Sequence, residues 1–536
     1  MRPLLLLLLV AALAVSAVIV TRRRAQETSP RRLEVSLWYW RQPFHIPDRE
    51  ASALRSMGVR QLFVRAGTFG VRNGQVCFTL PQQWKSGPPD IGIQLVFNYN
   101  YDVVRQFEKL PNQAISHALL DALAAQKSQA QAAGLNVVGV QLDLDSPTRL
   151  LPKYAALLQS IRPGLNGLPL SVTALPTWFM SPLVQQVVDA VDFTAPQFYE
   201  AETPRRLDHY VPLSRLSSVA EGMRRVARCG KPFYVGLPAY GHALVYNDQG
   251  DLMGAWHDLG LPEAARNPAF HLERAFPANA SGGQATPGSY IGEDIYDFTA
   301  EMRGSDGMRK PYHFVYDVPT PVLLEQHLAL VRRERPSNCA GVILFRYPEP
   351  GEASTLPMSA LQAVMNGTHP RPQLRVKMTL HSVPWDTIER DVKTSRMPTD
   401  LVLSVTNVGA ASTFLGSDTV TVTLSFDTPG LDDVEAGDFD DVKTFLATAG
   451  PQESPSTWMP CSRERANRIR FTRLYLGADE TAEIGPIRIP ADGPGQVSGA
   501  WTARDPGGFE TEKGTIEVTR PGDASRGSTV GGVGNG

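Results

Sequence analysis

Short apolar runs alternate with amphipathic stripes over the first two thirds of the chain. Eight runs, most of them bounded by Gly or Pro, cover residues 35–40, 62–66, 92–99, 137–145, 170–174, 193–199, 233–238 and 341–347. Continuous apolar runs of this length are typical of strands that are buried on both faces. Stripes with a 3.6-residue period separate most of them, for example over residues 112–133 and 150–161. The pattern therefore predicts repeated β–α units.

Eight such units favour a closed (β/α)8 TIM-like barrel of class α/β over residues 30–368. An open, doubly wound sheet is the alternative, but no Gly-rich phosphate loop follows the first strand. The stretch 242–320 is too long for a simple connection and is rich in aromatic residues. We therefore predict an inserted subdomain there, after the seventh strand.

The pattern changes near residue 371. Short runs separated by turn signals follow, at residues 374–380, 401–406, 420–426, 469–475 and 487–489. They predict an all-β domain over residues 371–520, and the turn Thr406-Asn407-Val408-Gly409 resembles one found in immunoglobulin-like modules of bacterial surface proteins. We expect an immunoglobulin-like sandwich, followed by a disordered Gly-rich tail at residues 521–536.

The N-terminus carries an apolar segment, residues 4–20, within a leader region of residues 1–25. It predicts export, either as a signal peptide cleaved after small residues or as a membrane anchor that stays in place. The arginines that follow, at positions 22–24, oppose easy export of the chain behind them. The predicted location is periplasmic or at the cell surface, with anchoring through this segment left open.

Composition narrows the function classes. The formal net charge is -2, so nothing indicates a general attraction to nucleic acid. None of the four cysteines has metal-ligand spacing, and we expect neither a metal nor a cofactor. Cys229 and Cys339 each precede a predicted strand, so they form either a disulfide at the bottom rim of the barrel or two free thiols.

Two carboxylates, Asp143 and Asp145, lie at the C-terminal end of a predicted barrel strand, where barrel enzymes place their active sites. Gln141, Asp143 and Asp145 share one face of the predicted strand 137–145, with the Cα atoms of neighbours on this face about 6–7 Å apart. Barrel enzymes carry functional side chains at the C-terminal ends of their strands. We therefore expect both carboxylates to open together into the mouth of the barrel. A hydrogen-bonded strand end or a helix cap is the alternative role.

The ends of the other strands contribute aromatic rings, amides and charged groups. Rings stack on the apolar face of a sugar, and amides and carboxylates bind its hydroxyls, so the predicted partner is a glycan or polysaccharide. Trp178 and Phe345 could equally pack the barrel top. Arg65 and Arg346 could pair with the carboxylates and lower their pKa. The candidate residues are Trp38, Trp40, Arg65, Asn98, Gln141, Trp178, Gln197, Tyr199, Glu200, Tyr240, Phe345 and Arg346.

Three segments resemble glycoside hydrolase family 18. Val138–Asp145 is similar to its Asp-x-x-Asp-x-Asp-x-Glu signature, with Asp143 at the third Asp and Asp145 at the catalytic Glu. Gln197–Glu200 resembles its Met/Gln-x-Tyr-Asp segment, and 341–345 resembles its eighth strand, with Phe345 in place of the usual Trp. Residues 30–366 as a whole look closer to the bacterial domain-of-unknown-function family 3142, through the stretches Gln141–Thr148 and Ser171–Trp178.

The resemblance to family 18 implies a retaining hydrolysis in which the substrate's acetamido oxygen attacks the anomeric carbon. Asp145 would be the general acid, Asp143 would orient the acetamide and Tyr199 would hold it. The chain departs from the signature at Val138 and Gln141, which replace two aspartates, and Asp145 has a shorter side chain than Glu.

Three hypotheses follow: a glycan hydrolase, a non-catalytic carbohydrate-binding protein and a structural protein of the cell envelope. Metal-dependent hydrolysis is weaker, because two aspartates without a neighbouring His make a poor metal site. His242 and His257 lack metal spacing, and we expect both at the surface.

Overall fold

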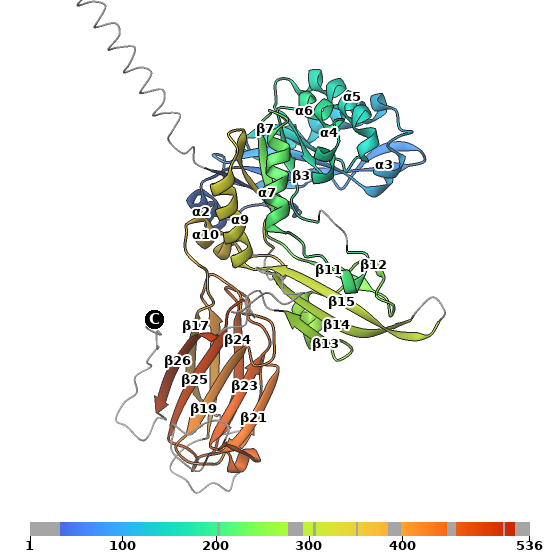
Figure 1. The fold of residues 1–536 in the computed structure, drawn as a ribbon. Coiled ribbons are helices and arrows are strands. Elements are labelled where there is room, and N and C mark those ends of the chain that lie inside the picture. Colours follow the sequence, from blue (N-terminus) through green and yellow to red (C-terminus); the bar gives the residue numbers. More distant parts are fainter. Residues whose placement is uncertain are drawn as a thin grey trace, which may run out of the picture. The chain divides into compact units, whose positions relative to one another are not determined.

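Eight parallel strands close into a barrel, as the sequence predicts (Figure 1). Around the ring the order is β1, β3, β6, β7, β8, β9, β10 and β16, and β16 returns to β1. The strands are β1 (Glu34–Tyr39), β3 (Val59–Arg72), β6 (Gly92–Tyr99), β7 (Val137–Asp143), β8 (Leu170–Ala174), β9 (Phe193–Pro196), β10 (Phe233–Pro238) and β16 (Cys339–Phe345).

This computed structural model describes residues 33–200, 204–276, 293–303, 307–349, 352–383, 398–447, 457–506 and 510–519. The apolar segment 4–20 and the Gly-rich tail 521–536 lie outside these ranges. Within the ranges, no helix combines the length and the apolar character that a membrane crossing requires.

Helices connect most of the barrel strands. They are α2 (Asp48–Met57), α3 (Tyr101–Gln106), α4 (Asn112–Ala132), α5 (Leu151–Ile161), α6 (Val184–Ala190), α7 (Leu216–Ala227) and α9 (Pro321–Glu334), and α10 (Met358–Met365) follows the last barrel strand. Gly58 ends α2 in the left-handed conformation, with a φ of 79°, and its N–H donates to Arg55. This turn reverses the chain directly into β3, because glycine adopts a positive φ without steric cost.

The interior of the barrel is packed with aromatic and aliphatic side chains rather than open. Trp38 is fully buried there, and its Nε1 donates to Oε1 of Gln141 at 2.7 Å. The Nε2 of Gln141 donates in turn to Oγ of Ser171 at 3.2 Å. These buried hydrogen bonds connect β1, β7 and β8, and they form a floor beneath the strand ends.

A second sheet follows β10 within the stretch where the sequence predicts an insertion. Its five antiparallel strands have the order β12-β11-β15-β14-β13, and α8 (Leu261–Arg266) accompanies them. The strands are β11 (His242–Tyr246), β12 (Leu252–Ala255), β13 (His271–Phe276), β14 (Glu293–Arg303) and β15 (Arg309–Pro319).

All strands beyond residue 374 are antiparallel, which confirms the predicted all-β region. They form two sheets, β17-β18-β24-β20 and β22-β21-β23-β19-β25-β26, and residues of both sheets share one apolar cluster. An immunoglobulin-like topology stays a prediction. The strands are β17 (Leu374–Ser382), β18 (Thr399–Asn407), β19 (Val420–Phe426), β20 (Asp433–Val434), β21 (Asp441–Leu446), β22 (Met459–Pro460), β23 (Arg468–Arg473), β24 (Thr481–Ile489), β25 (Gln496–Arg504) and β26 (Glu510–Thr519).

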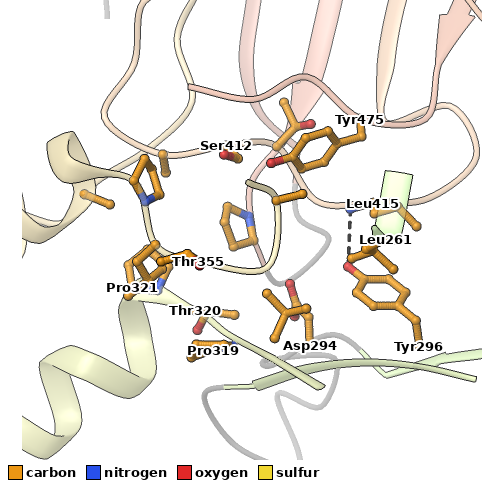
Figure 2. Close-up of a pocket in the computed structure, with 18 residues that line it drawn as sticks. Leu261, Asp294, Tyr296, Pro319, Thr320, Pro321, Thr355, Ser412, Leu415 and Tyr475 are labelled. Carbon is orange, nitrogen blue, oxygen red and sulfur yellow. Dashed lines mark hydrogen bonds between the residues drawn. The ribbon is translucent and has the colours of Figure 1, made fainter. Parts of the chain in front are cut away.

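The inserted sheet contacts the C-terminal sheets. The backbone N–H of Leu415 donates to the hydroxyl of Tyr296 at 3.3 Å, and Arg266 pairs with Asp440 at 2.8 Å. Figure 2 shows the cavity beside the first of these contacts. Its volume of about 50 Å³ is too small for a sugar ring, and none of its lining residues is a predicted site residue.

Cys229 and Cys339 are not bonded to each other. All four cysteines of the chain are free thiols, with Cys339 buried and Cys229 partly exposed. Of the two alternatives that the sequence leaves open, the structure therefore shows two free thiols.

We expect Gln141→Ala to lower the free energy of unfolding by about 2–4 kcal/mol, because it opens a small cavity and leaves the buried N–H of Trp38 without an acceptor. Thermal or urea unfolding of the full chain measures the change. Gln131→Ala, exposed on α4, is the matched control and should stay within about 0.5 kcal/mol of the wild type. Equal stability of the two variants would contradict the role given to Gln141.

Candidate functional site

Asp143 and Asp145, called the aspartate pair below, lie in different surroundings. β7 ends at Asp143, so Asp145 stands in the following loop rather than on the strand. Asp145 is exposed, but Asp143 is buried, and the expectation that both carboxylates open into the mouth is wrong for Asp143. The neighbouring strands hold it. Asn98 Nδ2 donates to its Oδ2 at 2.7 Å, and Thr173 Oγ1 donates to its Oδ1 at 2.6 Å.

These surroundings separate the roles of the two carboxyl groups. Burial raises the pKa of Asp143, although the hydrogen bonds from Thr173 and Asn98 oppose the rise. The side chain of Asp145 reaches solvent, but the atoms packed around it still desolvate the carboxyl group. This desolvation, followed by the negative charges of Asp143 and Glu200, raises the pKa of Asp145 to about 7. Because both oxygens of Asp143 already accept hydrogen bonds, a proton shared by the pair resides on Asp145. Asp145 can therefore donate a proton near neutral pH.

A buried hydroxyl without a partner lies next to the pair. The OH of Tyr199 makes no hydrogen bond within the described part of the chain. Burial raises its pKa well above the usual value, and the negative charges of Asp143 and Glu200 add to this. The Tyr199 ring stacks on Phe345, with centroids 5.4 Å apart and an interplanar angle of 18°, and meets Tyr240 edge-on at 5.8 Å. The rings of Phe345 and Tyr240 thus fix the position of the Tyr199 hydroxyl, a hydrogen-bond donor that has no acceptor among the described residues.

Glu200 has a partner that the sequence did not indicate. Its Oε1 lies 3.0 Å from Nδ1 of His242, whose Nε2 lies 3.3 Å from the hydroxyl of Tyr210. That hydroxyl donates to Oδ2 of the buried Asp317 at 2.9 Å, so it accepts from His242, and both ring nitrogens of His242 act as donors. His242 is thus a cation held between two carboxylates.

The pKa values in this chain of contacts follow from the same geometry. Burial opposes the positive form of His242, but Glu200 and Asp317 outweigh it and raise its pKa. Burial likewise opposes the negative form of Glu200, but the hydrogen bonds from His242 and Tyr240 lower its pKa. The prediction that His242 lies at the surface is wrong, since only 13% of its side chain is exposed. Its place on β11, inside the insertion, hid this role from the sequence pattern.

The arginines do not pair with the aspartate pair. Arg346 binds Glu349 at 2.9 Å and also binds Glu352. Arg65 forms no ion pair among the described residues, and its Nε is buried without a hydrogen-bond partner. The alternative in which an arginine pairs with Asp143 or Asp145 and lowers its pKa is therefore not what the structure shows.

Three predicted ligand contacts are buried instead. Trp38 and Gln141 form the floor described above, and Trp178 is 1% exposed. The indole Nε1 of Trp178 donates to the carbonyl of Ser146 at 2.9 Å, which fixes the loop that carries Asp145. These three residues have almost no solvent-exposed surface for a ligand to touch, so they support the site and do not bind a ligand directly.

The remaining candidates keep some exposed surface at the strand ends. Backbone hydrogen bonds place Gln197 there: its N–H donates to Ala174, and it bridges Gly236 of β10. Trp40 packs the edge of its ring against Phe345, with centroids 5.5 Å apart. The partly exposed candidates are Trp40, Arg65, Asn98, Gln197, Tyr240, Phe345 and Arg346.

No cluster of three or more His, Cys, Asp or Glu side chains in the described ranges is arranged to hold a metal ion. What the site does hold is a proton donor, a charged neighbour and an unpaired hydroxyl. This arrangement can transfer a proton to a bound molecule and hydrogen-bond to it at the same time.

Part of the chain matches a known family. The domain of unknown function DUF3142 matches residues 101–257, which confirms the predicted resemblance to family 3142 over that segment. The segment contains the aspartate pair, Tyr199 and His242 but not Trp40 or Arg65. No curated protein matches the chain.

Solved structures of similar fold include several glycosidases. A chitinase from Chromobacterium violaceum is 14% identical, over 62% of this chain and 98% of its own, with a TM-score of 0.39. A glycoside hydrolase family 18 N-acetylglucosaminidase from Paenibacillus barengoltzii is 13% identical, over 62% and 99%, with a TM-score of 0.37. The spore cortex-lytic enzyme SleL from Bacillus cereus is 13% identical, over 62% and 74%, with a TM-score of 0.36. Likenesses this distant leave the function to be argued from this chain's own residues.

We expect the stability of the protein to depend on the ionisation of Asp145. Its pKa rises from 3.8 in the unfolded chain to about 7 in the folded one, so the folded state binds more protons between these values. The free energy of unfolding therefore falls as the pH rises through this window, and the contribution is fully present only below about pH 4.

Asp145→Asn removes that contribution, so its unfolding free energy should fall less steeply between about pH 4 and pH 7 than that of the wild type. Thermal unfolding at a series of pH values measures the difference. Asp121→Asn, exposed on α4, serves as the control and should follow the wild type. If the curve of Asp145→Asn runs parallel to both, the raised pKa is wrong.

Proposed function

We propose that the barrel is a glycoside hydrolase that acts on a glycan containing N-acetylated amino sugars. The observation that carries the proposal is Asp145, a carboxyl group at the strand ends whose pKa is raised to about 7. A general acid works best when its pKa lies near the working pH. The resemblance of Val138–Asp145 and Gln197–Glu200 to family 18 places Asp145 and Tyr199 at matching positions.

The proposed reaction has two steps. In the first, Asp145 gives its proton to the glycosidic oxygen while the acetamido oxygen of the same sugar bonds to the anomeric carbon, and the leaving group departs as an alcohol. In the second, the Asp145 carboxylate takes a proton from water, which attacks the anomeric carbon and releases the acetamido oxygen. The proton returns to Asp145, and the configuration is retained.

The other residues position and tune the acid. Tyr199 carries a buried hydroxyl that has no partner among the described residues, and it can donate to the acetamide once a neighbouring side chain moves aside. Asp143 is buried and bound by two donors, so its part in this arrangement is electrostatic: its charge raises the pKa of Asp145. The aromatic side chains Trp40 and Phe345 offer ring surface at the mouth for a sugar.

Binding without hydrolysis is the second candidate function. Asp145 is one methylene shorter than the Glu of family 18, roughly 1.3 Å of reach, and a misplacement of about 1 Å can lower a rate ~100-fold. The buried Asp143 favours the same alternative, because it contacts no bound sugar unless it leaves Asn98 and Thr173. Export to the periplasm or cell surface, which the N-terminal segment predicts, fits either function.

The test is hydrolysis of amino-sugar oligosaccharides, each offered in an N-acetylated and a de-N-acetylated form. We expect release only from the acetylated form, a loss of about 100-fold or more in kcat for Asp145→Asn, and activity that declines above about pH 7 as Asp145 loses its proton. Tyr199→Phe should lower kcat by about 10-fold or more, and Asp121→Asn should leave the rate unchanged.

Equal release by the wild type and Asp145→Asn would remove Asp145 from the role of acid. Binding of the oligosaccharides with no turnover at any pH between about 4 and 9 would favour the non-catalytic function instead. Turnover of the de-N-acetylated form would rule out participation of the acetamide.

A further inference from the structure

Arg65 carries a positive charge at the barrel mouth and forms no ion pair with any described residue. It follows Phe63 by two residues on β3, so the alternation of a strand turns both side chains inward, where Phe63 packs on Trp38. The Arg65 side chain is partly exposed, but its Nε is closed to solvent and has no hydrogen-bond partner in the described ranges. Burial and the nearby Arg346 lower its pKa, which Glu349 partly opposes.

The neighbouring arginine is in a different state. Glu349 and Glu352 both bind Arg346 directly, whereas Arg65 interacts with Glu349 only from a distance. Gln82 donates to the backbone carbonyl of Arg65 at 3.1 Å, which fixes the strand but leaves the guanidinium unbound. The guanidinium of Arg65 is partly desolvated and binds no carboxylate directly among the described residues, so an anion bound from outside would gain a charge-assisted pair there.

The strand register brings an aromatic residue close to Arg65. β1 and β3 pair Trp38 with Phe63 and Tyr39 with Val64, and continuation of this register places Trp40 next to Arg65. Trp40 keeps part of its surface exposed. A ring face binds the apolar side of a sugar, and the planar fork of a guanidinium matches the two oxygens of a carboxylate.

We propose that Arg65 and Trp40 form a subsite for an acidic sugar, a ring that carries a carboxylate. The inference rests on the proposed glycan-directed function and names its substrate class, an acidic glycan. The loops after β7 and β9 carry the carboxyl groups of Asp145 and Glu200, and His242, the cation beside them, is already bound by Glu200, so Arg65 is the better partner for a carboxylate. The acidic sugar therefore binds on the β1–β3 side, and the sugar that is cleaved beside Asp145 is neutral.

The test measures binding by calorimetry with the full chain carrying Asp145→Asn, so that hydrolysis does not interfere. The probes are oligosaccharides of alternating N-acetylated amino sugar and uronic acid, the same molecules with their carboxyl groups reduced to alcohols, and sulfated neutral oligosaccharides. We expect the acidic probe to bind at least about tenfold more tightly than its reduced form, since one charge-assisted hydrogen-bonded pair is lost on reduction.

Adding Arg65→Gln should weaken binding of the acidic probe about 10- to 100-fold and leave the reduced probe unaffected. Arg65→Lys should keep part of the preference, because it keeps the charge but not the fork. Arg60→Gln, exposed at the opposite end of β3, is the matched control and should change nothing. Thermal unfolding checks that Arg65→Gln folds; removal of an unpaired charge should not lower its stability.

The outcomes separate this inference from the proposed function. Equal binding of acidic and reduced probes, unchanged by Arg65→Gln, overturns the acidic subsite while the proposed function stands. A preference for the sulfated probe over the carboxylated one overturns the carboxylate as the recognised group. If no probe binds and the wild type releases no sugar from any of them, both the subsite and the proposed function are wrong.

Discussion

The hydrogen bond between Trp38 and Gln141 crosses the interior of the barrel and supports everything above it. The indole N–H of Trp38 costs free energy if it is buried without an acceptor, and the side-chain amide of Gln141 costs free energy if it is buried without partners. Each satisfies the other, with Ser171 completing the set. The strand that carries Gln141 is thereby fixed in height and rotation, and the aspartate pair follows on the same strand and the loop after it.

The barrel could be predicted because its strands are buried on both faces and its helices on one face. The strands therefore appear in the sequence as continuous apolar runs, and the helices appear as apolar stripes with a 3.6-residue period. The end of β7 could not be predicted, because the alternation of polar and apolar residues at 141–145 continues two residues past the end of the strand at Asp143. The burial of Asp143 depends on Asn98 and Thr173, which come from other strands and share no local pattern with it. β21, β25 and β26 were missed. β25 and β26 are neighbours in the chain and pair with each other, but β26 is rich in charged and polar residues and contains no apolar run.

Charge at the strand ends is divided between two sides. Asp143, Asp145 and Glu200 make the β7 and β9 side negative, and Asp145 keeps its proton as a result. Arg65, which binds no carboxylate directly among the described residues, places a cation on the β1 and β3 side. The identity of these residues could be read from the sequence, but their separation could not, because it depends on which arginine finds a glutamate: Arg346 does, through the loop after β16, and Arg65 does not.

His242 belongs to the inserted sheet, yet it compensates the charge of Glu200 at the end of the barrel, and Asp317 of the same sheet favours its charged form. The insertion is therefore an electrostatic component of the barrel and cannot be trimmed like an ordinary surface loop. Relatives that shorten it would have to abandon the acidic residue at position 200 or supply another cation. Among relatives, the residue type at position 200 should therefore vary together with the length of the inserted segment that carries His242.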